Sequence, residues 1–279
     1  EPIGPMTLRL IVTQILAKSE VYERLLHRCC FVIVPHANPD GEAANRAWID
    51  HWPDPVAYLR HVRREKPGRD VEFGYPDLRI ENHHVASFLD DHGPMAMHAS
   101  LHGMAAAEGG QLLIERHWVD RTRDLRREFG RALTAAGMPM MDWDRAGEKG
   151  FWYIAPGFMT TPEGAAMREH FRRAGDHETA ERFRDSSMEY VRRLGGDPLC
   201  LVTELPLLLL TKKVAAGEPG APATFLALRQ ALPGMKRKAA EGKSVDADLR
   251  RFGVEPVDCA TLVRLQLTAI GLGMAASCA

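Results

Sequence analysis

Cysteine is scarce in this sequence, and its five copies among 279 residues show no pairing pattern. The number is odd and no two cysteines form a Cys-x-x-Cys pair, which disfavours a disulfide framework and a structural zinc knuckle. Cys29 and Cys30 precede an apolar run and are expected to be buried free thiols. Free thiols persist in a reducing compartment, so we predict a cytoplasmic protein.

Several other signals are missing, and each absence excludes a class of protein. The 36 basic side chains nearly balance the 37 acidic ones, so no net charge recruits nucleic acid or an anionic membrane. The apolar segment from Pro256 lacks an uninterrupted span of about 18 residues, so no transmembrane helix is predicted. There is no His-Glu-x-x-His, no Gly-x-Ser-x-Gly and no phosphate-binding glycine loop. These absences disfavour helix-motif metalloproteases, elbow-type serine hydrolases and nucleotide-binding folds.

Alternating strand and helix patterns are what the sequence does contain. Apolar runs without polar alternation are typical of strands that are buried on both faces, and they predict strands over 30–36, 94–103, 109–118 and 199–206. Helical spacing predicts helices over 3–28, 79–93, 119–136, 176–194 and 207–215, with further helices to the end. Residues 137–164 look like a loop, and 50–77, rich in Pro, His, Arg and Trp, predict a long functional loop.

This alternation predicts an α/β fold with a mostly parallel or mixed sheet and helices on both faces. We expect a catalytic domain over 1–215 and a helical C-terminal extension over 216–279 that packs on it. In such sheets, ligands bind at the carboxyl ends of the strands. The Asn38–Gly41 turn, His102 and Glu204 all fall at predicted strand ends. This shared placement indicates a site more strongly than any one of these residues does.

Each candidate also has an ordinary structural explanation when it is taken alone. Histidine is the commonest metal ligand, yet a strand histidine before glycine, such as His102, is more often structural. Glu204 fits an exposed strand end or a helix N-terminal acid equally well. Glu1 could simply belong to a frayed chain terminus, and Asn45 could end a turn. Arg46 could be an ordinary surface arginine.

Taken together and in order, these pieces resemble the zinc carboxypeptidase (metallocarboxypeptidase) family over about residues 1–210. The segment "EPIGPMTLRLI" resembles the second half of the family's His-x-x-Glu motif, with Glu1 as the carboxylate. "VIVPHANPDG" resembles the family's strand that ends in Asn-Pro-Asp-Gly. "SLHG" resembles the strand closed by a histidine, here His102, and "VTELP" the late strand that carries a glutamate, here Glu204. The motif's own histidine and the first strands of the family's sheet would precede residue 1.

The resemblance implies a zinc-dependent hydrolase that cleaves the C-terminal amide bond of a peptide or a small amide. It implies that Glu1 and His102, with the upstream histidine, hold one Zn²⁺. Glu204 would be the general base for the metal-bound water. Asn45 and Arg46 are the candidates for the pair that binds the terminal carboxylate of the substrate.

Some parts of the family pattern have no clear counterpart. The oxyanion-stabilising arginine is unassigned, and Tyr153 and Tyr190 are the candidates for the family's mobile tyrosine. An N-acyl amino acid deacylase of the aspartoacylase type would share the order of the zinc-site residues and act on small molecules. A pseudo-peptidase would bind peptide ends as a scaffold. The preferred C-terminal residue and the oligomeric state do not follow from the sequence.

Overall fold

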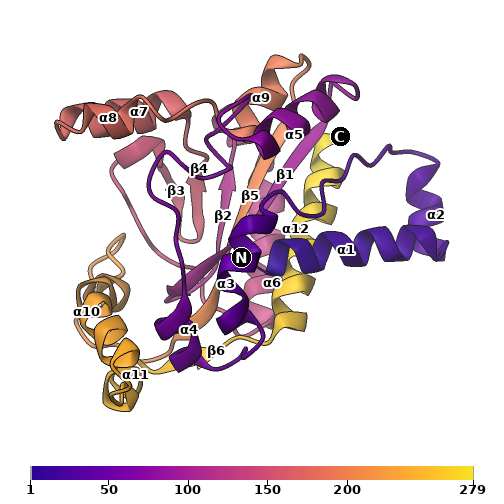
Figure 1. Ribbon diagram of the computed structural model, residues 1–279. Coiled ribbons are helices and arrows are strands. Elements are labelled where there is room, and N and C mark those ends of the chain that lie inside the picture. The colour runs from indigo at the N-terminus through magenta and orange to yellow at the C-terminus, as the bar shows by residue number, and fades with distance from the viewer. Residues whose placement is uncertain (1, 279) are drawn as a thin grey trace.

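A mixed β-sheet forms the centre of the protein in the computed structural model, which describes residues 2–278 (Figure 1). In the described part of the chain its strands are β1 Met97–Ala107, β2 Gln111–Ile114, β3 Tyr153–Ala155, β4 Phe158–Thr160, β5 Leu199–Leu210 and β6 Val254–Pro256. The spatial order is β1-β5-β2-β4-β3, and β6 pairs with the far end of β5. β1 and β5 are parallel, whereas β2 is antiparallel to β5 and parallel to β4. The predicted α/β fold with a mixed sheet is confirmed.

Helices surround this sheet. They are α1 Ile3–Leu16, α2 Glu20–Leu26, α3 Pro39–Ile49, α4 Pro55–His61, α5 Ile80–Asp90, α6 Arg123–Ala135, α7 Gly164–Arg173, α8 His177–Ala180, α9 Ser187–Arg193, α10 Ala223–Ala240, α11 Asp246–Phe252 and α12 Cys259–Ser277. Three short 3-10 turns are η1 Arg116–Trp118, η2 Asp120–Thr122 and η3 Glu148–Gly150. In Figure 1, α1, α6 and α12 lie on one side of the sheet and α7 lies across from them, on the side of β3 and β4.

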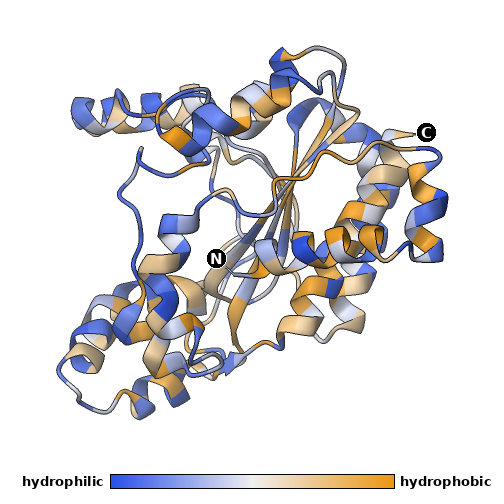
Figure 2. Cartoon of the chain, turned by 45° about the vertical axis from the view of Figure 1, so that its right-hand side comes forward, coloured by the Kyte–Doolittle hydropathy of each residue, from blue (hydrophilic) through white to orange (hydrophobic). Residues whose placement is uncertain are grey.

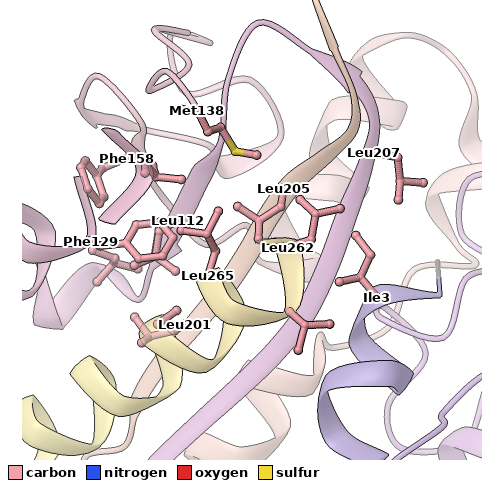
Figure 3. Packing of buried hydrophobic residues seen from close by; sticks show 14 of the residues in the cluster. Ile3, Leu112, Phe129, Met138, Phe158, Leu201, Leu205, Leu207, Leu262 and Leu265 are labelled. Carbon is pink, nitrogen blue, oxygen red and sulfur yellow. The ribbon is translucent and has the colours of Figure 1, made fainter. Parts of the chain in front are cut away.

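The main hydrophobic core lies between the sheet and α1, α6 and α12. Leu112 of β2, Leu201 and Leu205 of β5, Phe129 of α6 and Leu262 of α12 are all at most 1% exposed (Figure 3). Burying one such side chain contributes about 1.5–3 kcal/mol. Figure 2 shows the hydrophobic colour following the central strands and the helices beside them.

A smaller apolar cluster covers the opposite face of the sheet. It joins Cys200 and Val202 of β5 to Leu113, Met159 and the α9 residue Met188, with Phe151 packed against it. Leu201 of β5 faces α12, because a Cβ added at Gly273 of that helix would lie 2.8 Å from the Leu201 side chain. Side chains alternate between the two faces of a strand, so the neighbouring Cys200 and Val202 point away from α12. The two faces are therefore covered by different segments.

Two secondary-structure predictions and one burial prediction near the start of the chain are wrong. The predicted strand over 30–36 is extended coil, because no other described backbone pairs with it, and its Cys30 is exposed rather than buried. The predicted turn at Asn38 is the start of α3: the Asn38 side chain accepts a hydrogen bond from the Gly41 N–H at 2.9 Å, and Pro39 is the first helical residue. Asparagine before proline is a typical N-cap sequence.

The two long strands extend further than predicted. β5 runs through Leu210, so the predicted helix over 207–215 is wrong. The run Leu207–Leu210 is apolar throughout, and periodicity alone cannot separate a buried strand from a buried helix. Strand pairing makes this run a strand, because β1 pairs with it up to Leu209 and β6 pairs with Leu208 to Leu210 on the other side. His102 and Glu204 consequently lie within long strands rather than at strand ends.

Several other boundaries also differ. The predicted helix over 176–194 is divided into α8 and α9, because Ser186 and Glu189 form a capping box that starts a new helix. The predicted loop over 137–164 contains η3, β3 and β4, and the irregular stretch over 50–77 contains α4. The predicted helix over 3–28 corresponds to α1 and α2, that over 79–93 to α5, and that over 119–136 to η2 and α6. The predicted strand over 109–118 is β2, and its last residues form η1.

The C-terminal residues are built into the same sheet and core. Residues 216–279, predicted as a helical extension, supply α10, α11 and α12 but also strand β6. Within residues 2–278, α12 is the one helix long and apolar enough to cross a membrane by length and composition. One such helix is weak evidence, because a core helix of a soluble protein passes the same test. Its buried Leu262 and Leu265 belong to the main core.

Candidate active site

His102 and Glu204 lie side by side in the middle of the sheet. They are directly paired residues of the parallel strands β1 and β5, and Gln111 of β2 is paired with Glu204 on its other side. Paired residues of neighbouring strands point to the same face. That face is the one turned away from α12, because Leu101 and Leu201 occupy the α12 face. Two of the sequence-predicted site residues, separated by about a hundred positions, are thus brought together.

A carboxylate that sequence reasoning missed lies next to His102. The His102 Nε2 atom is 3.3 Å from Glu72 Oε2 and 2.9 Å from Ser100 Oγ. The Ser100 hydroxyl donates to Glu72 Oε2 at 3.0 Å, and the Ser187 hydroxyl donates to Glu72 Oε1 at 2.7 Å. His98 Nε2 lies 2.9 Å from the same Ser187 oxygen. Glu72 is therefore the centre of a polar cluster on the site face.

The chain around Glu72 is held by main-chain pairing. The N–H groups of Ser187 and Arg184 donate to the carbonyl oxygens of Glu72 and Phe73, at 3.1 and 2.9 Å. The Tyr75 N–H donates to Asp185 in the same short ladder. This pairing fixes part of the predicted functional loop over 50–77 against the start of α9. This pairing explains how Glu72, from a segment without helix or strand periodicity, comes to lie beside His102 of β1.

The electrostatics of this cluster follow from burial and hydrogen bonding. Burial raises the pKa of Glu72, but hydrogen bonds from His102 and Ser187 and the nearby imidazoles outweigh it, so the pKa falls below its ordinary value of 4.5. Glu72 is thus a carboxylate at neutral pH. Burial lowers the pKa of His98 below 6.5, which favours its neutral form. A buried negative charge therefore lies beside His102, and such charges are normally compensated by a cation.

The first turn of α1 packs on the α12 face of β1, opposite the His102 side chain. A Cβ at Gly4 would lie 2.4 Å from the main-chain oxygen of Leu101, and a Cβ at Gly103 would lie 3.0 Å from Ile3. Figure 3 shows Ile3 at the start of α1, next to the sheet. Glu1, the predicted carboxylate ligand, lies outside the described residues, so its role stays a prediction.

A second polar network lies under the sheet, on the α12 face. The fully buried Gln266 donates to the main-chain oxygen of His102 at 3.2 Å and to Thr203 Oγ1 at 3.1 Å. Its own oxygen accepts from the Thr7 hydroxyl of α1 at 2.6 Å. The Thr203 hydroxyl donates to the same His102 oxygen. Through Gln266, α12 joins α1 to the strand position that carries His102.

Arg145 is a partly buried cation that sequence reasoning also missed. Its side chain is 13% exposed, its guanidinium lies 3.9 Å from the centre of the Phe151 ring and 4.8 Å from that of Trp143, and Nε has no hydrogen-bond partner within residues 2–278. Its nearest carboxylate is Glu148, at 3.5 Å. Burial lowers the pKa of Arg145, and Glu204 is among the carboxylates whose charge opposes this. Phe151 packs on the site face, so Arg145 lies over the same face as Glu204.

Asn45 and Arg46 lie on α3, and their contacts are local. Arg46 pairs with Glu42 and Asp50 at 3.1 and 3.5 Å, and its side chain is 61% exposed. The Asn45 side chain bonds to main-chain atoms of Gly41 and Arg63 and to the Trp48 indole. Among the described residues, none of these contacts reaches His102 or Glu204. Asn45 and Arg46 thus make local contacts of α3, and these contacts do not bring them to His102 and Glu204.

The two tyrosine candidates have partners elsewhere. The Tyr153 hydroxyl donates to Asp142 at 2.7 Å, and the Tyr190 hydroxyl donates to Asp90 at 2.6 Å. Burial and these carboxylates raise the pKa of both phenols to about 12. Neither hydroxyl bond involves the site face. A surface hollow of about 620 Å³, lined by α6 residues with Met140 and Phe158, also lies away from His102 and Glu204.

The donor chemistry around His102 fits a metal only in part. A histidine whose one ring nitrogen contacts a carboxylate is typical of metal sites, where the other nitrogen binds the ion. With Nε2 turned to Glu72, that nitrogen would be Nδ1. Within residues 2–278, however, no group of three or more His, Cys, Asp or Glu side chains could hold a metal. A complete site would therefore need Glu1 and the histidine that the resemblance places before it.

Comparisons with family models, with curated proteins and with solved structures found no match to this chain.

Proposed function

We propose that this chain carries the hydrolytic site of a zinc-dependent carboxypeptidase-like enzyme, which cleaves the C-terminal amide bond of a peptide or small amide. One observation carries the proposal. Two of the four motif segments found in the sequence, which carry His102 and Glu204 about a hundred residues apart, lie next to each other on one face of the paired strands β1 and β5. If His102 and Glu204 had separate structural roles, nothing would require them to be neighbours.

In this proposal His102 holds the metal together with Glu1 and the upstream histidine. When bound, zinc supplies a Lewis acid and a water of lowered pKa. Glu204 is the general base: it takes the proton from the attacking water and passes it to the leaving amine, a role worth about 10²–10⁴-fold. Its position beside His102 on the neighbouring strand suits this role.

The substrate's own charge requires a partner, and Arg145 suits it better than Arg46. A terminal carboxylate is bound most strongly by a guanidinium that is shielded from water. Arg145 is 13% exposed and lies over the site face, whereas Arg46 is 61% exposed. We therefore extend the proposal by placing the substrate's carboxylate at Arg145.

Glu204→Gln tests the proposal in the chain extended upstream through the His-x-x-Glu motif. We expect hydrolysis of C-terminal residues to be abolished while one zinc per chain is retained. The exposed Glu255→Gln on β6 is the matched control and should keep full activity. If the Glu204→Gln variant still hydrolyses its substrate, the assignment of Glu204 as the general base is wrong.

Two other functions make different predictions in the same assays. A deacylase of the aspartoacylase type would cleave N-acyl amino acids rather than peptides, so a screen of both substrate classes separates the two enzymes. A pseudo-peptidase scaffold would bind peptide ends without a metal. Mass spectrometry of zinc, with and without His102→Ala, decides this: a scaffold need hold no metal, and the enzyme should lose its zinc with His102.

A further inference from the structure

The Glu72 cluster is built from two matching histidine–serine pairs. His102 contacts Ser100 and His98 contacts Ser187, each through Nε2 at 2.9 Å. Both serine hydroxyls contact Glu72, one at each carboxylate oxygen, at 3.0 and 2.7 Å. The Glu72 side chain is 18% exposed and Ser187 is 5% exposed. The cluster is thus a buried network that ends on a single carboxylate.

The directions of these hydrogen bonds are fixed by the donors that each group has. An ionised carboxylate can only accept, so each serine must give its single hydroxyl proton to Glu72. The serine oxygens can then only accept from the histidines. Both imidazoles must therefore carry a proton on Nε2. The direct contact of His102 Nε2 with Glu72 Oε2, at 3.3 Å, requires the same proton.

We infer that Glu72 is a positioning residue that holds the His102 ring in one orientation with a proton on Nε2, so that Nδ1 carries the lone pair when the ring is neutral. The role of Nδ1 as a metal ligand depends on the function proposed above, but the tautomer does not. Ser100 and Ser187 hold the carboxylate itself in place. The main-chain ladder between 72–75 and 184–187 holds its segment.

A nucleophilic serine is the other chemistry that a serine–histidine pair suggests. In such a pair the histidine accepts the hydroxyl proton. Here both hydroxyl protons go to Glu72 and both histidines donate, which is the reverse direction. The cluster is therefore arranged to orient histidines and not to activate a serine.

Nitrogen-15 NMR of the histidine side chains tests the inference on metal-free protein. His102→Asn identifies the His102 signals among the twelve histidines. We expect the Nε2–H form in the wild type and a mixture of both tautomers in Glu72→Gln, because the amide of glutamine can donate as well as accept. Glu65→Gln is the control: it removes a negative charge from the same segment, but its contacts are to Arg79 and Asn38. An Nδ1–H form in the wild type, or an unchanged tautomer in Glu72→Gln, overturns the inference.

Zinc titration then separates this inference from the proposed function. In the upstream-extended chain, Glu72→Gln should weaken zinc binding about 10–100-fold, as the loss of an outer partner of a ligating histidine does, and Glu65→Gln should not. If the chain holds no zinc but the tautomers respond as expected, the positioning role stands and the enzyme proposal fails. If Glu72→Gln does not fold, Ser100→Ala replaces it. That variant keeps the charge and removes one of the two His102 contacts, so an unchanged His102 ring signal there contradicts the inference.

Discussion

Gly4 lies against the main-chain oxygen of Leu101, so closely that a Cβ at Gly4 would be 2.4 Å from it. The first turn of α1 therefore sits directly on β1, one residue before His102. This contact couples the start of the chain to the strand that bears the candidate ligand. The contact is on the α12 face of β1, so it can affect the site through the position of the strand.

Gly4→Ala should consequently push α1 away from β1. We expect a loss of about 1–3 kcal/mol in the free energy of unfolding, as for other insertions into a packed core, and weaker zinc binding in the upstream-extended chain. Gly271→Ala in α12 is the matched control, because nothing lies within 4 Å of a Cβ there. It should be neutral or stabilising by up to about 1 kcal/mol. Chemical denaturation of both variants measures the difference, and equal stabilities would show that α1 does not depend on this contact.

The site residues found from sequence are those whose neighbours carry a local pattern. His102 and Glu204 lie in apolar runs that predict strands, and their order along the chain is only a resemblance to a family pattern. The strand lengths were wrong because the ends depend on pairing between segments about a hundred residues apart. The predicted strand over 30–36 failed for the same reason, since an apolar run cannot show whether a partner strand lies beside it.

Glu72 and Arg145 could not be found in this way. Glu72 becomes part of the site only because its segment pairs with the start of α9, a long-range contact with no local signal. Arg145 is distinguished by burial, which a sequence does not display. For Arg46 a signal did exist, because Glu42 and Asp50 lie four residues before and after it. Oppositely charged residues at this spacing on a helix pair with each other, which favours a structural role.

Gln266 should link the stability of the fold to the site. Gln266→Met keeps the approximate volume but leaves the Thr7 hydroxyl and the His102 carbonyl without this buried partner. We expect a loss of about 1–3 kcal/mol in the free energy of unfolding. Thr268→Val is the control from the same helix, since the Thr268 hydroxyl makes an exposed hydrogen bond to the Arg264 carbonyl of its own turn. A shift of the His102 amide resonance in Gln266→Met but not in Thr268→Val would show that the effect reaches the site.

His98 should make the protein less stable in acid. Its pKa is lowered below 6.5 by burial, so the unfolded chain binds a proton at a pH where the folded chain does not. This contribution to stability is complete above about pH 6.5 and decreases as the pH falls below that value. We expect the free energy of unfolding of the wild type to drop between pH 7 and pH 5, and to drop less in His98→Gln. The exposed His51→Gln should behave as the wild type, and identical pH profiles for all three proteins would contradict the assignment.

Arg145 and Arg46 make opposite predictions for substrate binding, which a pair of matched variants can separate. If Arg145 binds the substrate's carboxylate, Arg145→Gln should lower kcat/KM by about 10–100-fold, because a hydrogen bond to a charged group is worth about 1.5–3 kcal/mol. The loss should appear mainly in KM, and it should be small for substrates whose C-terminal carboxylate is amidated. Arg46→Gln removes an exposed arginine from the i,i+4 pairs of α3 and should leave kcat/KM nearly unchanged. The reverse result, with activity lost in Arg46→Gln and kept in Arg145→Gln, would restore the residue pair predicted from the sequence and require α3 to move toward the sheet when substrate binds.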